Sequence, residues 1–252
     1  MRFKQTAMIM PTGGDSGGAT IRNQDKTITE NGTYTADNGY TGLGKVTVNV
    51  VGSGGGQELL NEFIDGEITE INSPTTSIRA TLCQGLQNLR TANFPNATSI
   101  GDDAFRECKT LTTANFPMVT TIGDDAFYSC EAVRNMSFPS ATTVETYVFS
   151  NCKSLESLDF PLLTTIGNNA FRSCEVLSAL ILRKGKVCTL NSTNALTSTL
   201  IASGTGYIYV PSALVEQYKL AKNWSTYASQ IRAIEEYTVD GTVTGELDET
   251  KI

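Results

Sequence analysis

Four cysteines at a constant spacing are the first residues in this sequence whose type and pattern suggest chemistry. They recur every 22 residues, at Cys108, Cys130, Cys152 and Cys174. A structural zinc ion needs four ligands that converge on one point, with each sulfur ~2.3 Å from the metal. If each period is one coil of a stacked structure, the four cysteines are spread over ~15 Å. We therefore expect reduced cysteines that act as small buried residues, and neither a metal nor a cofactor is predicted.

One short string matches a catalytic motif. The residues Gly-Asp-Ser-Gly-Gly at 14–18 have the sequence that surrounds the nucleophile of trypsin-like serine proteases. In those proteases a histidine accepts the proton of the nucleophilic serine, which would be Ser16 here. This chain contains no histidine, so the required base is missing. The flanking residues are rich in glycine and polar side chains. We interpret residues 11–20 as a linker and predict no catalytic residue.

Paired acidic residues recur in the region of the cysteines. Asp102-Asp103 and Asp124-Asp125 occupy equivalent places, and Asn168-Asn169 fills the same place in a later repeat. A column of carboxylates would suit calcium, whereas a single Asp or Asn oxygen is sufficient to cap a helical turn. Because Glu145-Thr146 overlaps this place in the third repeat and Asn168-Asn169 fills it in the fourth, we expect capping of a short helical turn rather than a metal site.

These residues belong to four consecutive segments of 22 residues, which run from Leu89 to Val176 without a gap. Each segment also repeats two phenylalanines. The first set is Phe94, Phe116, Phe138 and Phe160, each followed by proline, and the second is Phe105, Phe127, Phe149 and Phe171. A fixed period of this length indicates a solenoid, because one unit is too small to bury its own apolar face.

One repeat predicts how each coil is built. Leu111, Ala114 and Phe116 follow the pattern L-x-x-A-x-F, in which inward and outward residues alternate as in a short strand. Pro117 ends that strand, and Ile122 points inward again after a corner, ahead of the short helical turn. Stacked copies place equivalent residues ~4.8 Å apart. The predicted fold class is an α/β solenoid with short parallel strands and short helical turns.

The outward positions of the predicted strands form a candidate ligand-facing surface, which we name the ribbon. Its residues are Thr91, Asn93, Thr113, Asn115, Asn135, Ser137, Ser157 and Asp159. These side chains are small, form hydrogen bonds and are nearly uncharged. They suit a polar ligand such as a glycan, although the ribbon lacks the aromatic rings that many sugar sites use. The alternative, that they are only solvent-facing strand residues, stays open.

The repeat resembles the leucine-rich repeat, specifically the BspA-like or treponemal class. The consensus of that class is A-F-x-x-C-x-x-L-x-x-x-x-F/I-P-x-x-x-x-x-I-G, and the resemblance to it covers residues 89–176. Residues 64–88 and 177–196 match more loosely, as expected of the coils that cap a solenoid. The resemblance implies a leucine-rich repeat with 22-residue repeats and a role in binding.

The chain before the repeats divides into two predicted parts. Residues 1–50 contain a flexible start and a small β module, in which Asn31-Gly32 and Asn38-Gly39 predict turns and residues 46–50 alternate as a strand. This module resembles one found in structural proteins of phages and prophages of Gram-positive bacteria. Residues 51–58 form a Gly/Ser linker, which would leave the module free to move against the solenoid.

The C-terminal part is predicted to close the solenoid, which with its caps covers residues 59–237. Residues 206–211 indicate a last strand, and Ser212 is a candidate N-cap for a helix over 213–222. Trp224 and Tyr227 follow at helical spacing and are expected to seal the open end. BspA-like proteins close with a similar segment, carried here by Tyr209-Val210-Pro211, Leu214, Tyr218 and Asn223-Trp224. Residues 238–252 form a polar tail.

Charge and hydropathy exclude several classes of partner. The net charge is −7 and no run of Lys or Arg occurs, so we expect no nucleic-acid partner. No stretch of 18 apolar residues exists, and the first residues lack the apolar segment of a secretory signal peptide. We expect no membrane insertion, and a location on a virion or phage tail, or on a cell surface by a route that the sequence does not reveal.

Two functions follow from these expectations. The first is a non-catalytic recognition or structural module associated with the tail of a phage or prophage. The alternative is a bacterial cell-surface adhesin of the BspA type that binds a host protein or glycan. An enzyme is not expected, because no histidine and no convergent acid–base pair is present. The ligand and the oligomeric state are left open.

Overall fold

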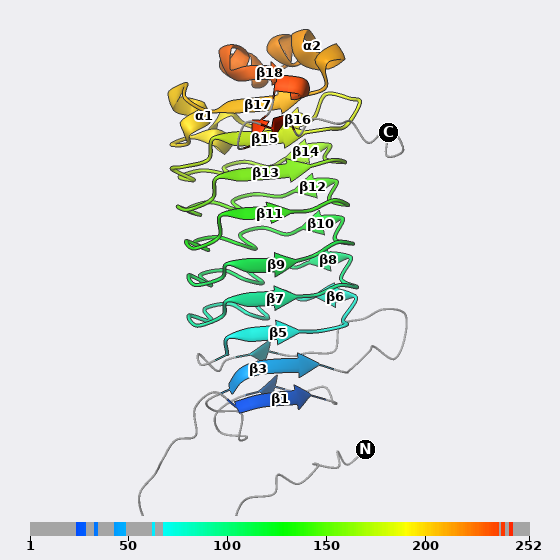
Figure 1. The fold of residues 1–252 in the computed structure, drawn as a ribbon, viewed down its shortest axis with the longest axis vertical. Helices are drawn as coiled ribbons and strands as arrows, with labels where there is room; N and C mark the ends of the chain where they lie inside the picture. Colours follow the sequence, from blue (N-terminus) through cyan, green and yellow to red (C-terminus); the bar gives the residue numbers. More distant parts are fainter. Residues whose placement is uncertain are drawn as a thin grey trace, which may run out of the picture.

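The computed structural model describes residues 68–236 continuously and, outside that range, the strand residues 24–28, 33–34, 43–48, 62–63, 238–239 and 242–243. The chain winds into an elongated solenoid whose coils stack along one axis (Figure 1). Each repeat coil contributes one strand to a first side, a shorter strand to a second side and a run of turns to a third side. The predicted solenoid of short parallel strands is confirmed.

The first side consists of two five-stranded sheets, both parallel. The sheet nearer the N-terminus has the order β1 (Gln24–Ile28), β3 (Leu43–Val48), β5 (Glu70–Asn72), β7 (Thr91–Asn93) and β9 (Thr113–Asn115). The other sheet has the order β11 (Asn135–Ser137), β13 (Ser157–Phe160), β15 (Ala179–Leu182), β17 (Tyr207–Val210) and β18 (Ile231–Ala233).

The second side is one parallel six-stranded sheet. Its strands are β6 (Ser77–Ile78), β8 (Ser99–Ile100), β10 (Thr121–Ile122), β12 (Thr143–Val144), β14 (Thr165–Ile166) and β16 (Thr189–Leu190). The register follows the repeat throughout, so that Ile100 pairs with Ile122 and Ile166 with Leu190. Two small sheets complete the strands, with β2 (Thr33–Tyr34) parallel to β4 (Glu62–Phe63) and β19 (Thr238–Val239) antiparallel to β20 (Thr242–Val243).

The third side differs in detail from the short helical turns that we expected. In the coil after β8 it is a run of turns in which Asp103 and Glu107 both have positive φ, 56° and 59°. Left-handed residues at this spacing prevent an α-helix from propagating. The Asp103 and Phe105 N–H groups donate instead to carbonyls of the next coil, at 2.9 and 2.8 Å. The third side is therefore held by hydrogen bonds between coils.

Two columns of phenylalanine rings fill the interior. Phe138 stacks between Phe116 and Phe160, with both centroid distances 5.9 Å, as predicted. It also meets Phe127 and Phe149 of the other column, at 5.9 and 5.7 Å with the ring planes tilted by 58°. All five rings are almost fully buried. The repeat period thus becomes a continuous aromatic core along the axis.

The C-terminal cap contains the strand and helix that we expected. Its helices are η2 (Thr193–Leu196), α1 (Leu200–Ser203), η3 (Ser212–Leu214), α2 (Val215–Leu220), η4 (Trp224–Gln230) and η5 (Ile234–Glu236). Ser212 is not an N-cap, because it lies inside η3 and no side chain caps η3 or α2. Trp224 and Tyr227 are buried, and their side chains donate to the carbonyls of Cys188 and Thr193, both at 2.6 Å. The predicted seal is confirmed.

The N-terminal strands join the solenoid rather than forming a separate module. β3 pairs with β5 in the first sheet, so that Val46 lies opposite Ile71, and β1 pairs with β3. The expectation of free movement between module and solenoid is therefore wrong, because backbone hydrogen bonds between neighbouring strands fix their relative position. Residues 51–58, the predicted linker, lie outside the described residues, as does the polar tail apart from β19 and β20. Within the described part of the chain, every helix is too short or too polar to cross a lipid bilayer.

Candidate ligand-binding ribbon

The alternation of each first-side strand places the ribbon residues outward. In β7 and β9 the inward residues are Ala92 and Ala114, while the Thr and Asn on either side of them face away from the core. The register aligns equivalent residues, so that Asn93 lies opposite Asn115 and Ser157 opposite Asn135. The structure brings the eight predicted residues together in two groups of four, one in each sheet of the first side. Their role in binding stays a prediction.

Side chains within the ribbon bond to one another from coil to coil. The Asn115 amide donates to Asn93 Oδ1 at 2.8 Å, and the Asn93 amide donates to Asn72 Oδ1 at 3.0 Å. In the other sheet, the Ser157 hydroxyl donates to Asn135 Oδ1 at 2.7 Å. These bonds hold the amides in one orientation before any ligand arrives. Preorganised polar groups lose less conformational entropy when they bind.

The first side is interrupted between β9 and β11. No strand pairing joins these two among the described residues, although every other neighbouring pair along this side is bonded. The inward residue changes there from Ala114, which is only partly buried, to the larger Met136. The four ribbon residues beside the break are exposed, and they are Thr113, Asn115, Asn135 and Ser137. The centre of the ribbon thus combines accessible side chains with two strand edges that carry backbone donors and acceptors.

Aromatic residues that the ribbon lacks lie further along the same side. Tyr207 and Tyr209 occupy the outward positions of β17, and their rings meet edge to face at 6.2 Å. The Arg232 guanidinium lies over the Tyr207 ring, 4.7 Å from its centroid. Sequence reasoning missed these residues, because they lie after the last regular repeat. The alternation in Tyr207-Ile208-Tyr209-Val210 was the signal that would have found them.

The one acidic residue of the ribbon is already paired. Arg183 donates through Nε to both carboxylate oxygens of Asp159, each at 2.9 Å, and its Nη2 lies 2.8 Å from Oδ2. The Arg183 side chain is 18% exposed, so water screens this pair only in part. The negative charge of Asp159 is therefore neutralised by Arg183. The rest of the ribbon consists of uncharged Thr, Asn and Ser side chains.

The paired aspartates do not cap their own turns. Asp102 Oδ1 accepts the N–H of Asp124 in the next coil at 2.9 Å, and Asp124 Oδ1 accepts that of Thr146 at 2.7 Å. The second member of each pair is left-handed, a conformation that Asp and Asn adopt more readily than most residues. Arg106 lies between Asp103 and Asp125, at 3.1 and 3.4 Å. Its guanidinium therefore pairs with the second aspartates of two neighbouring coils.

Burial and hydrogen bonding account for the cysteine column. All four column cysteines are free thiols at 0% exposure, as predicted. Each Sγ donates to a carbonyl of the preceding coil, as in Cys130 to Phe105 and Cys152 to Phe127, both at 3.1 Å. Burial raises the pKa of Cys108 and of Cys174 to about 12. Among the described residues no cluster of His, Cys, Asp and Glu is arranged to hold a metal ion, and Ser16 lies outside them.

The repeat geometry agrees with a comparison of the sequence with known families. A model described as the BspA type leucine rich repeat region matches residues 62–195, in six copies. This match covers more than half of the chain. The protein belongs to the BspA-type leucine-rich repeat family. The six family repeats run from β4 to η2, whereas the solenoid of this BspA-type protein continues beyond them, through β1 and β3 at one end and β17 and β18 at the other.

Solved leucine-rich repeat structures are similar to this BspA-type chain at low identity. One from Bacteroides ovatus is 22% identical, with 67% of this chain and 42% of that protein covered and a TM-score of 0.43. A T. pallidum leucine rich repeat protein is 21% identical over 80% of this chain and 85% of its own, also with a TM-score of 0.43. A leucine rich cell surface protein from Faecalibacterium prausnitzii is 18% identical over 75% and 59%, with a TM-score of 0.35. No curated protein sequence matches significantly.

Proposed function

We propose that this protein is a non-catalytic recognition module that binds a protein or glycan on a cell surface through the ribbon. The observation that carries the proposal is the interrupted first side, where β9 and β11 present exposed, preorganised Asn, Ser and Thr side chains beside two strand edges. Membership of the BspA-type family supports a role in recognition.

The chemistry of the ribbon favours a neutral polar ligand. Amide and hydroxyl groups both donate and accept hydrogen bonds, as the hydroxyl groups of a glycan do. Asp159 is neutralised by Arg183, so the ribbon presents little net charge. Tyr207 and Tyr209 extend the same side with aromatic surface, against which sugar rings and apolar side chains both pack well.

Two observations support a non-catalytic role. The chain has no histidine, so the usual general base is missing. The column cysteines are buried and their pKa values are raised, so they carry no thiolate at neutral pH.

The biological setting that we propose is the tail of a phage or prophage, with a BspA-type adhesin as the alternative. The resemblance of residues 26–50 to phage structural proteins favours the first, and family membership favours the second. Induction of the prophage in the producing strain distinguishes them. A tail protein sediments with phage particles, whereas an adhesin stays with the cell envelope whether or not particles form.

A binding screen of the intact chain against glycan arrays and whole bacterial cells tests the ribbon. We expect Asn115→Arg and Asn135→Arg to weaken binding by about tenfold or more, since each places a bulky charge at the centre of the ribbon. Thr121→Arg is the matched control, because it adds the same exposed charge to the second side at the level of β9. Equal binding by all three variants, each with an unchanged melting temperature, would refute the ribbon as the binding surface.

A further inference from the structure

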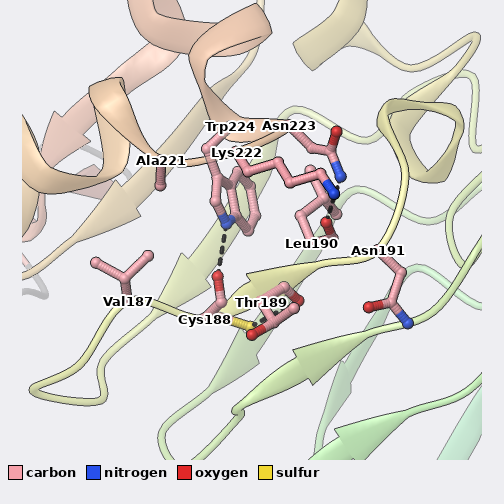
Figure 2. Close-up of a pocket in the computed structure, with 9 residues that line it drawn as sticks. All are labelled: Val187, Cys188, Thr189, Leu190, Asn191, Ala221, Lys222, Asn223 and Trp224. Atoms are coloured by element: carbon pink, nitrogen blue, oxygen red, sulfur yellow. Dashed lines mark hydrogen bonds between the residues drawn. The ribbon is translucent and has the colours of Figure 1, made fainter.

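The C-terminal end of the second side contains a pocket that the ribbon does not use. It lies between β16 and the segment from Ala221 to Trp224 and has a volume of about 250 Å³ (Figure 2). The pocket arises because β16 is the last strand of its sheet, so that no further strand covers its outer edge. Side chains of the C-terminal cap form hydrogen bonds to part of this edge instead.

Cap side chains satisfy most of the backbone groups on this edge. The Cys188 carbonyl accepts from Trp224 Nε1, the Cys188 N–H donates to the Tyr218 hydroxyl at 2.8 Å, and the Leu190 carbonyl accepts from the Asn223 amide at 2.7 Å. The N–H group of Leu190 is the exception. The N–H groups of Thr189 and Asn191 both donate to the β14 side, and successive groups alternate along a strand. The Leu190 N–H therefore points toward the pocket.

This N–H is an unused donor in a buried place. Leu190 is 3% exposed, and within the described residues its N–H has no hydrogen-bond acceptor. Buried backbone donors nearly always have a partner, so an unpaired one at the wall of a pocket indicates a place for an acceptor. The Asn223 amide adds a second donor, because only one of its two hydrogens is needed for the bond to Leu190.

The stretch of sequence that supplies the lining of the pocket carries a net positive charge. Residues 183–222 contain five Lys or Arg residues and one Glu, a net charge of +4 in a chain whose total is −7. Arg183 is paired with Asp159, and Lys219 with Glu216. Lys222 lines the pocket, and in the described part of the chain neither it nor Lys184 or Lys186 forms an ion pair. The charge of Lys222 favours an anion in the pocket.

The two sides of the pocket differ in polarity. Val187 and Ala221 lie on one side of Trp224, and Lys222 and Asn223 lie on the other, close to Leu190 (Figure 2). We propose that the pocket binds a small organic phosphate. Its oxygens accept from the Leu190 N–H, the Asn223 amide and the Lys222 ammonium, and its carbon skeleton packs against Val187 and Ala221. A phosphate has enough oxygens for three donors from different directions, and Lys binds phosphate as a point charge.

Calorimetric titration of the intact chain with glycerol 1-phosphate tests this proposal. We expect saturable binding that weakens as salt is added, weaker binding of inorganic phosphate and acetate, and none of glycerol. Lys222→Gln should weaken the binding by about tenfold, since it removes a charged donor. Lys109→Gln is the matched control, because it removes the same charge on the third side of a central coil and should leave the affinity within about twofold.

Filling the apolar side of the pocket provides a second test. Ala221→Phe should abolish the binding of glycerol 1-phosphate, and a thermal melt shows whether that variant is folded. Lys222 is exposed, so Lys222→Gln is expected to fold. If Ala221→Phe does not fold, Lys222→Gln still tests the pocket. The proposal fails if glycerol 1-phosphate does not bind, if glycerol or acetate binds equally well, or if Lys109→Gln weakens binding as much as Lys222→Gln. The ribbon variants Asn115→Arg and Asn135→Arg should leave phosphate binding unchanged, so the two sites are judged separately.

Discussion

Each column cysteine combines burial with one specific hydrogen bond. The Sγ of Cys130 donates to the Phe105 carbonyl, which also accepts the N–H of Cys108, so the thiol adds a second bond to a carbonyl inside the third side. An aliphatic residue of similar size would fill the space without making this bond. The repeated Cys is thus a small apolar residue with one useful donor.

Reactivity of the thiols tests this account. Because the column is buried and the pKa values are raised, we expect a thiol reagent to label the native protein slowly and the denatured protein rapidly at neutral pH. Rates are measured by mass spectrometry after quenching. Fast native labelling of Cys130, or a mass lower by two protons for each pair of cysteines, would contradict buried free thiols.

The same thiols predict a loss of stability in alkali. The folded-state pKa of Cys108 and of Cys174 is raised to about 12 from the ordinary 9.0, because burial disfavours the thiolate. Unfolded thiols therefore ionise first, and their contribution to stability is complete below pH 9 and is lost as the pH rises toward 12. Denaturant unfolding at several pH values measures this decline. Cys108→Ser should show a smaller decline than the native protein over that range.

At the scale of the coil, strand register also aligns surface charges. The residue after each column cysteine alternates in sign, in the order Lys109, Glu131, Lys153 and Glu175. One ion pair of this row is formed, between Glu131 and Lys153 at 3.3 Å. Both side chains are partly exposed, so the pair contributes at most ~1 kcal/mol. The row also favours the observed register, because a shift by one residue would separate the opposite charges on adjacent coils.

Reversing one charge tests the row. Glu131→Lys places Lys109, the new lysine and Lys153 on consecutive coils, so we expect a loss of up to ~1 kcal/mol at low salt that shrinks as salt is added. The double variant Lys109→Glu with Glu131→Lys makes one of the two repulsive neighbours attractive again without changing the pair at 153 and 175, and should recover part of the loss. Melting curves at low and high ionic strength measure both. Identical curves for Glu131→Lys and the native protein at low salt would show that the row has no effect.

At the scale of the whole molecule, stability depends on contacts between coils that continue along the axis. Phe138 contacts four other rings, so Phe138→Ala should cost ~3–5 kcal/mol through lost burial and a cavity. Met118→Ala, at a side chain 50% exposed in the preceding coil, is the control and should change little. Denaturant unfolding compares them. Similar losses for the two variants would mean that the phenylalanine columns do not dominate the core.

Removal of residues 1–56 tests how far the solenoid extends. Sequence reasoning predicts a small cost, because a glycine-rich linker follows the N-terminal module. The pairing of β3 with β5 now predicts a lower melting temperature and faster hydrogen exchange at Asn72, whose strand becomes an edge and whose N–H faces β3. Exchange at Leu158, far along the axis, serves as the internal control. Unchanged exchange at Asn72 would support an N-terminal module that is independent of the solenoid.

The repeat region could be predicted from its sequence because its interactions are periodic. Spacing alone identified the inward Phe, Ile and Cys residues, the strand that stops at Pro117 and the stacking of Phe138 between Phe116 and Phe160. When every coil has the same length, stacking in register is the arrangement that buries all the apolar positions at once. The outward placement of the ribbon residues follows from the same alternation.

The tertiary structure decided the features that depend on differences between neighbouring coils. The break between β9 and β11 accompanies the change from Ala114 to Met136, and the Asp102 carboxylate bonds to the next coil rather than to its own turn. The pairing of β3 with β5 and the pocket beside Leu190 likewise depend on what lies above or below a given coil. A one-dimensional pattern specifies which side of a strand faces the core, but whether adjacent backbones come within hydrogen-bonding distance depends on side-chain volumes packed in three dimensions.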